Sequence, residues 1–199
     1  MRPGVKRILN RWMRHSEIVN ELSIPDTRQD AADILIRAGY KELGTGGFAG
    51  VYAKDGSPDC VKLYTTRDRG YSDFLSMVAK NPNLHFPRIT GRRRLLGSYY
   101  AVRMERLTPA PKEMHPQIEM IDDYIISIKY SDYLDRERIE EVHAYMDAHP
   151  DLKEACDLIA QVLRNGGGDY LCDLAPRNVM MRGDTLVITD PIETDDSEW

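Results

Sequence analysis

The chain has 199 residues, of which 27 are Lys or Arg and 32 are Asp or Glu, so its formal charge at neutral pH is −5. With 42% apolar and 30% charged residues it has the composition of a folded globular protein, long enough for one medium domain or two small ones. The acidic balance removes the long-range attraction to phosphate backbones that nucleic-acid binding needs. No apolar run approaches the roughly 20 residues that span a bilayer. We therefore expect neither a nucleic-acid nor a membrane partner.

The three cysteines, Cys60, Cys156 and Cys172, lie far apart and form no C-x-x-C pair. Such a sparse, odd set is typical of a reducing compartment and not of a disulfide framework or a zinc site. The five histidines show no metal-binding spacing either. The sequence thus indicates a cytoplasmic protein.

The N-terminal part is predicted to be helical. Apolar residues recur at helical spacing over 5–22, and a second helix is expected from a cap at Asp26 or Thr27 to about Ala38, ending at Gly39. The pattern then changes to that of strands, which are expected at 40–44, 49–54 and 59–65. A helix is expected at 68–80, followed by strand-like runs at 87–95 and 98–106.

The second half is predicted to be mostly helical, with helices near 113–128, 134–148 and 150–165, then short strands within 170–190 and a frayed acidic tail from Glu193. Strands and helices are segregated along the chain, which favours an α+β fold over alternating βαβ units. We expect three parts: a helical extension at 1–39, a five-stranded lobe at 40–107 and a mostly helical lobe at 108–199.

A glycine cluster, LGTGGFAGVY, occupies residues 43–52. Glycines let backbone N–H groups approach phosphate oxygens, although such a hairpin can equally be a structural turn. The following segment is a strand and not a helix, and no Gly-Lys-Ser/Thr follows, so neither a dinucleotide fingerprint nor a Walker motif is present. Lys62 lies eleven residues after Val51 on the returning strand, where its ammonium can reach phosphates held by the loop.

A second cluster lies in residues 170–191. Asp173 and Asn178 are five residues apart in a loop, and Asp190 ends an apolar strand twelve residues beyond Asn178. Oxygen ligands on Asn178 and Asp190 suit Mg²⁺, which takes few protein ligands and keeps waters and phosphates. Asp173 is then available to orient a hydroxyl nucleophile and accept its proton.

This order of a glycine-rich hairpin, a strand Lys, Asp-x-x-x-x-Asn and a further Asp resembles the protein-kinase fold over about residues 40–191. More closely, it resembles the early serine/threonine kinases of short-tailed (autographivirus-type) bacteriophages. The resemblance implies a two-lobed fold with a five-stranded N-lobe and a truncated, mostly helical C-lobe. It also implies ATP- and Mg²⁺-dependent transfer of the γ-phosphate to Ser/Thr of host proteins in the host cytoplasm.

The resemblance also implies roles for single residues. Asp173 and Lys62 would be catalytic, and Asn178 and Asp190 would bind the metal ion. Met104 would lie near the gatekeeper position. The residues expected to contact the nucleotide are Gly44, Gly46, Phe48, Val51, Lys62, Glu105 and Leu107.

The chain departs from the kinase pattern at several places. Ala49 stands where the kinase pattern has the third glycine of the loop, which is compatible with the pattern if its φ is negative. Leu171-Cys172 replaces His-Arg, and Asp190-Pro191-Ile192 replaces Asp-Phe-Gly. Because only eight residues follow Pro191 in this sequence, we expect no activation segment.

The helix at 68–80 contains no Glu to pair with Lys62, so Asp73, and after it Asp68, are the acidic candidates. Two alternatives to a protein kinase therefore stay open: a small-molecule phosphotransferase of the aminoglycoside type, and an inactive pseudokinase that binds and inhibits a host protein. The intact Lys62, Asp173, Asn178 and Asp190 favour catalysis, whereas the missing Glu favours the inactive alternative.

Overall fold

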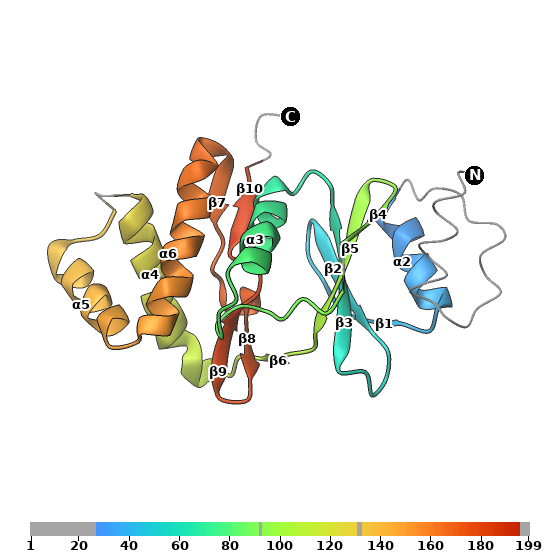
Figure 1. Ribbon diagram of the computed structural model, residues 1–199, viewed down its shortest axis with the longest axis horizontal. Coiled ribbons are helices and arrows are strands. Elements are labelled where there is room, and N and C mark those ends of the chain that lie inside the picture. Colours follow the sequence, from blue (N-terminus) through green and yellow to red (C-terminus); the bar gives the residue numbers. More distant parts are fainter. Residues whose placement is uncertain (1–26, 92, 131–132, 196–199) are drawn as a thin grey trace. The chain divides into compact units, whose positions relative to one another are not determined.

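The computed structural model describes residues 27–91, 93–130 and 133–195 (Figure 1). The chain divides into two compact units. The first unit contains the described residues up to Thr66 together with Arg88–Arg106, and the second contains Arg67–Pro87 together with the residues from Leu107 onward. The α+β class expected from the sequence is confirmed, whereas the helix predicted at 5–22 lies outside the described residues.

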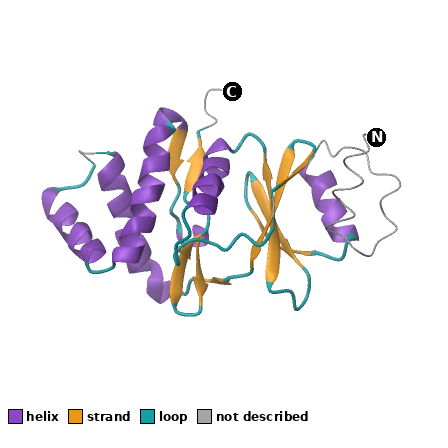
Figure 2. Ribbon diagram, viewed as in Figure 1, coloured by secondary structure: helices purple, strands orange, loops and turns teal. Residues whose placement is uncertain are grey.

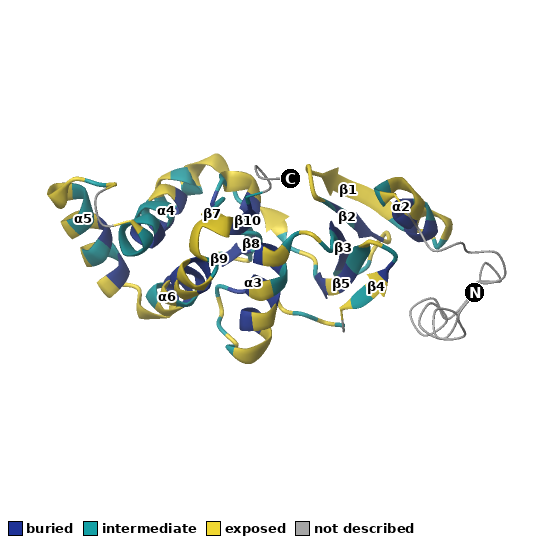
Figure 3. Ribbon diagram, turned by 90° about the horizontal axis from the view of Figure 1, so that it is seen from above, coloured by how far each residue is buried: buried dark blue, intermediate teal, exposed yellow. Residues whose placement is uncertain are grey.

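The first unit is built on a five-stranded antiparallel sheet with the strand order β1-β2-β3-β5-β4 (Figure 2). Its strands are β1 (Lys41–Thr45), β2 (Ala49–Ala53), β3 (Asp59–Thr65), β4 (Arg94–Leu96) and β5 (Tyr99–Glu105). All five were predicted, although β4 is shorter than the expected run at 87–95 because only an isolated bridge at Ile89 precedes it. Strands β2, β3 and β5 contain most of the buried residues, whereas β1 is exposed along its length (Figure 3).

Helix α2 (Arg28–Arg37) covers one face of this sheet. Thr27 caps it as predicted, in a reciprocal capping box with Asp30, and Gly39 follows its end with a φ of +85°. Its apolar side packs on residues that alternate along β2, β3 and β5, namely Tyr52, Val61, Leu63 and Ala101, together with Leu96. Strand alternation therefore places Val51, Lys62 and Val102 on the other face.

The second unit contains four helices of eight residues or more among its described residues: α3 (Arg69–Lys80), α4 (His115–Lys129), α5 (Arg136–Asp147) and α6 (Pro150–Asn165). Pro150 lies at the first position of α6, where its missing N–H costs nothing, and the apolar side of α6 packs on α4 and α3. Helix α3, which the sequence placed between strands of the 40–107 segment, groups with this second unit. None of the described helices is both long and apolar enough to cross a membrane.

Short strands complete the second unit. Strands β6 (Thr108–Pro109), β8 (Val179–Arg182) and β9 (Thr185–Ile188) form one sheet, and β7 (Tyr170–Cys172) pairs with β10 (Ile192–Thr194) in another.

The prediction of a frayed tail from Glu193 is wrong for the residues of β10. Thr194 is buried, and its hydroxyl oxygen accepts a hydrogen bond from the N–H of Gly70 at 2.9 Å. A Cβ on Gly70 would lie 2.7 Å from the Cγ2 of Ile192, so only glycine permits this approach of α3 to β10. The tail is ordered here because its apolar and hydroxyl side chains are buried against α3, which its acidic composition does not reveal.

Candidate functional site

The glycine-rich segment forms the turn between β1 and β2. Gly46 N–H donates to the carbonyl of Ala49 at 2.8 Å, and Thr65 N–H donates to the carbonyl of Phe48 at 3.1 Å. The described non-glycine residues have negative φ throughout, so Ala49 meets the condition set for it. Gly50 is required for a different reason, because a Cβ there would lie 2.8 Å from the hydroxyl of the buried Tyr52.

Lys62 lies next to this turn on β3. It is 6% exposed, and its neighbours across the sheet are Val51 on β2 and Val102 on β5. Cys60 on β3 pairs with Met104 on β5, and these are the next side chains on the same face of the sheet as Lys62 and Val102. The first unit thus brings together Lys62, Val51 and the glycine turn, as the sequence predicted for a nucleotide-binding surface.

Glu105 ends β5 and is held by the segment before β4. Its N–H donates to the Arg88 carbonyl at 3.0 Å, and its Oε1 accepts from the Arg88 N–H at 2.8 Å. The carbonyl of Glu105 accepts a hydrogen bond from the Cys60 thiol at 3.4 Å, and burial raises the pKa of that thiol to about 11. Leu107, which the sequence also predicted to contact the nucleotide, belongs to the second unit.

Asp173, Asn178 and Asp190 are brought together in the second unit by backbone pairing at both ends of the loop 173–178. At one end, the N–H of Asp173 donates to the carbonyl of Pro191 at 3.0 Å, directly after Asp190. At the other end, the N–H and hydroxyl of Thr189 donate to the carbonyl of Asn178 at 2.9 and 2.8 Å, directly before Asp190. The three residues predicted to share a site therefore lie on adjoining backbone segments.

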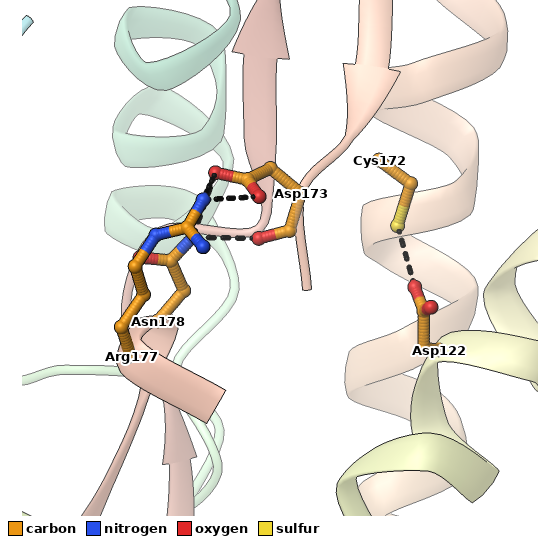
Figure 4. Close-up of polar contacts among 5 residues, drawn as sticks. All are labelled: Asp122, Cys172, Asp173, Arg177 and Asn178. Carbon is orange, nitrogen blue, oxygen red and sulfur yellow. Dashed lines mark hydrogen bonds and ion pairs between the residues drawn. The ribbon is translucent and has the colours of Figure 1, made fainter. Parts of the chain in front are cut away.

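The Asp173 carboxylate is held by two neighbours in its own loop (Figure 4). One Nη of Arg177 donates to both carboxylate oxygens, at 2.7 and 2.9 Å, and the Asn178 amide donates to Oδ2 at 2.9 Å. Asn178 also donates to the Asp173 carbonyl at 2.6 Å and is itself buried. Because a carboxylate offers about four lone-pair positions, these three bonds leave Asp173 able to accept one more hydrogen bond.

Cys172, the residue before Asp173, is joined to helix α4. Its thiol donates to the Asp122 carboxylate at 3.3 Å (Figure 4). Burial raises the pKa of Asp122, with smaller contributions from Asp123 and Asp173 in the same direction, and the hydrogen bond from Cys172 lowers it. Burial also raises the pKa of the Cys172 thiol, which favours its neutral form.

Replacing Asp122 with Asn is expected to stabilise the protein at neutral pH. The pKa of Asp122 is raised in the folded state, so its protonated form favours folding. This stabilisation is fully present below the pKa of Asp in the unfolded chain, about 3.9, and is lost as the pH rises through the folded-state pKa. A neutral amide avoids that loss, so the free energy of unfolding should rise by about 0.5–1 kcal/mol at pH 7.5, with solvent screening limiting the gain. Urea unfolding at pH 7.5 and below pH 4 measures the difference, which should disappear at the acid end.

Asp123→Asn is the matched control, because Asp123 lies next to Asp122 on α4 but pairs with the Arg138 guanidinium at 2.6 Å. That substitution should leave stability unchanged or lower it at pH 7.5. An Asp122→Asn variant less stable than wild type at pH 7.5 would contradict the assignment.

Asn178 and Asp190 fit the requirements of Mg²⁺ in the chemistry of their donors. The amide nitrogen of Asn178 donates both of its hydrogens to Asp173, and the Oδ1 of Asn178 is the atom that can bind a metal ion. Asp190 supplies a carboxylate. Both are hard oxygen ligands, as Mg²⁺ prefers, and phosphates and waters complete its shell. Within the described ranges, no group of three or more His, Cys, Asp or Glu residues forms a metal cluster.

The two acidic candidates on α3 have partners within the second unit. Asp73 accepts a hydrogen bond from the Tyr170 hydroxyl at 2.7 Å. Burial is the main cause, and this hydrogen bond the next, that raises the pKa of Tyr170 to about 12. Asp68 caps α3 by accepting from the N–H of Tyr71 at 3.0 Å.

Two contacts were not predicted from the sequence. Arg177 binds Asp173, a contact that the four-residue spacing permits. Arg28 donates to the carbonyls of Gly46 and Gly47. No sequence pattern signals that second contact, because 18 residues separate Arg28 from the turn.

No protein-family model matches the chain, and no curated protein sequence matches it. Among solved structures, the chain is similar to the crystal structure of Rad53 1-466 in complex with AMP-PNP, with a TM-score of 0.38 and 17% sequence identity. The similarity covers 82% of this chain and 42% of that chain, so this chain spans less than half of that structure's length. A likeness at this level does not assign a function to the chain.

Proposed function

We propose that the protein is an ATP-dependent protein kinase that transfers the γ-phosphate to Ser or Thr hydroxyls. The main support is the convergence of Asp173, Asn178 and Asp190 on the two paired ends of one loop. Lys62 beside Val51 and the glycine turn supplies the second half of the required machinery. Both sets also match the motif order that resembles protein kinases, from a glycine-rich hairpin to a final Asp.

Each residue then has a distinct task. The backbone amides of the glycine turn and the Lys62 ammonium bind the phosphates of ATP. Val51 contacts the apolar side of the nucleotide, and backbone groups near Glu105 and Leu107 meet its adenine edge. Bound Mg²⁺, held by Asn178 and Asp190, would neutralise charge that develops on the phosphates.

Asp173 orients the acceptor hydroxyl through its remaining lone pair and takes the proton as the bond to phosphorus forms. Arg177 and Asn178 hold this carboxylate in one rotamer, so the orientation is set before the substrate arrives. Because the transition state of phosphoryl transfer is loose, this positioning matters more than the basicity of Asp173.

The acceptor is inferred to be a protein of the bacterial host, on the resemblance to phage kinases. A formal charge of −5 favours encounters with neutral or basic targets, and added salt should weaken this preference. A small-molecule phosphotransferase would use the same Asp, Asn and Asp residues, so the identity of the labelled product distinguishes the two.

An inactive pseudokinase is the second candidate, and the sequence of α3 favours it. This helix, Arg69–Lys80, contains no Glu, the residue type that pairs with the strand Lys in the kinase pattern. In this alternative the protein binds nucleotide or a host protein without transferring phosphate.

The test measures transfer of label from γ-labelled ATP by purified protein, alone and with bacterial lysate, for wild type and Lys62→Met. Methionine keeps the length of the buried side chain and removes its charge, so transfer should fall by about 10²-fold or more while the fold is kept. Lys41→Met is the control, because Lys41 is an exposed strand lysine paired with Asp55 and should retain wild-type transfer.

Phosphoserine or phosphothreonine in host proteins supports the proposed function. Label confined to a small metabolite would replace it with the phosphotransferase, and ATP binding without any label would replace it with the pseudokinase. A Lys62→Met variant that transfers at the wild-type rate would show that Lys62 is not part of the site.

A further inference from the structure

The tip of the glycine turn is held by a residue from outside the sheet. One Nη of Arg28, the first residue of α2, donates to the carbonyl of Gly46 at 2.5 Å and to that of Gly47 at 3.1 Å. The position of a Cβ on Gly46 or Gly47 is open space, so the contacts that hold the tip are hydrogen bonds: the one from the Gly46 N–H to the Ala49 carbonyl within the turn, and those from Arg28.

Arg28 is itself fixed by the way α2 is anchored. Thr27 and Asp30 form the capping box at its start, and the apolar side of α2, including Ala31 and Leu35, is buried on the sheet. The guanidinium therefore extends from a rigid base, and the position of the turn depends on the docking of this helix.

The consequence follows from the geometry of the peptide bond. In a trans peptide the carbonyl and the N–H of the next residue point in opposite directions, and the described chain contains no cis peptide. Turning the carbonyls of Gly46 and Gly47 toward Arg28 therefore turns the N–H groups of Gly47 and Phe48 away from it. Residues Val61 and Leu63 of β3 pack with α2, and the alternate residue Lys62 lies on the other face of the sheet. We infer that N–H groups that point away from Arg28 face the Lys62 side.

We propose that Arg28 is a positioning residue of the nucleotide site: its contact with the carbonyls of Gly46 and Gly47 presents the amides of Gly47 and Phe48 to the phosphates of ATP. The proposal rests on the proposed nucleotide-binding function. Successive N–H groups that point in one direction form an anion-binding concavity. If nothing held the glycine turn in one conformation, ordering its backbone on nucleotide binding would cost conformational entropy and weaken the binding. Arg28 reduces that cost without touching the nucleotide.

The experiment compares wild type with Arg28→Ala, Arg28→Lys and the matched control Arg37→Ala. Arg37 lies in the last turn of the same helix and is exposed, so its removal changes the net charge equally without touching the turn. Calorimetry with Mg·ADP gives the dissociation constant. Steady-state transfer separates the KM for ATP from kcat, and backbone NMR follows the amides of Gly47 and Phe48.

Arg28→Ala is expected to weaken Mg·ADP binding and raise the KM for ATP by about five- to twentyfold, with kcat changed less. This range lies where the effect of an ordinary hydrogen bond meets that of a hydrogen bond to a charged group. Arg28→Lys should restore part of the affinity, and Arg37→Ala should bind as wild type. In the free protein, the Gly47 and Phe48 amide signals should shift and broaden in Arg28→Ala but not in Arg37→Ala.

Wild-type affinity in Arg28→Ala, with Lys62→Met still impaired, would overturn the role of Arg28 and leave the proposed function intact. Equal losses in Arg28→Ala and Arg37→Ala would also overturn it, because they would reflect net charge or helix stability. Absence of Mg·ADP binding by wild type would overturn both proposals together.

Discussion

Asp173→Asn should abolish most phosphate transfer while leaving nucleotide binding intact. The amide can no longer accept the proton of the acceptor hydroxyl, and loss of a positioned acid–base group typically costs about 10²–10⁴-fold in rate, or about 3–5 kcal/mol of barrier. Single-turnover transfer from labelled ATP measures the loss, and calorimetry with Mg·ADP measures binding, which should stay within about threefold because Asp173 is not assigned to nucleotide or metal.

Asp184→Asn provides the control for this substitution. Asp184 is an exposed residue of the turn between β8 and β9, so the same change of charge should leave transfer unaffected. Stability should barely change in Asp173→Asn, because the ion pair that is lost is with Arg177, whose side chain is 69% exposed. Transfer within threefold of wild type in Asp173→Asn would remove this residue from the mechanism.

Asp190→Asn should eliminate transfer by removing the only full negative charge assigned to the metal ion. We expect a loss of about 10³-fold or more, together with loss of the Mg²⁺-dependent part of nucleotide binding. Titration of ATP binding with and without Mg²⁺ distinguishes this effect from unfolding, because metal-independent binding should remain.

Truncation after Thr194 is the companion variant. It removes acidic residues of the C-terminal segment but keeps β10, whose last residue, Thr194, is bonded to Gly70. The truncated protein should therefore retain Mg²⁺-dependent binding. If the truncation abolishes that binding while Asp190→Asn does not, the metal ligands are in the C-terminal segment and not at Asp190.

The sequence predicted the local elements well because their signals are local. Thr27 as a cap, Gly39 after the helix end and Pro150 at a helix start each determine a boundary through their own hydrogen bonding or φ. The convergence of Asp173, Asn178 and Asp190 was also predictable, because one hairpin of fixed length separates the last two.

Features that depend on tertiary packing could not be predicted in this way. The apolar side of α3 shows that the helix is buried but does not specify the partner, and its contacts with β10 and α6 place it in the second unit. Glu193 and Thr194 belong to a polar segment whose order comes from pairing with β7 and from burial against α3. The contacts of Arg28 and Arg177 depend on the direction of long side chains, which spacing does not determine.

The pairing at both ends of the loop 173–178 limits how the site can move. The residues on both sides of Asp190 are tied to this loop, Pro191 by the N–H of Asp173 and Thr189 to the carbonyl of Asn178, so we expect a backbone displacement of Asp190 to break both bonds. Such an opening is a cooperative local unfolding event with a cost far above that of a side-chain rotation. The positions of Asp173, Asn178 and Asp190 are thus set by the folding of the second unit, and we expect this part of the proposed site to be in place before any substrate binds.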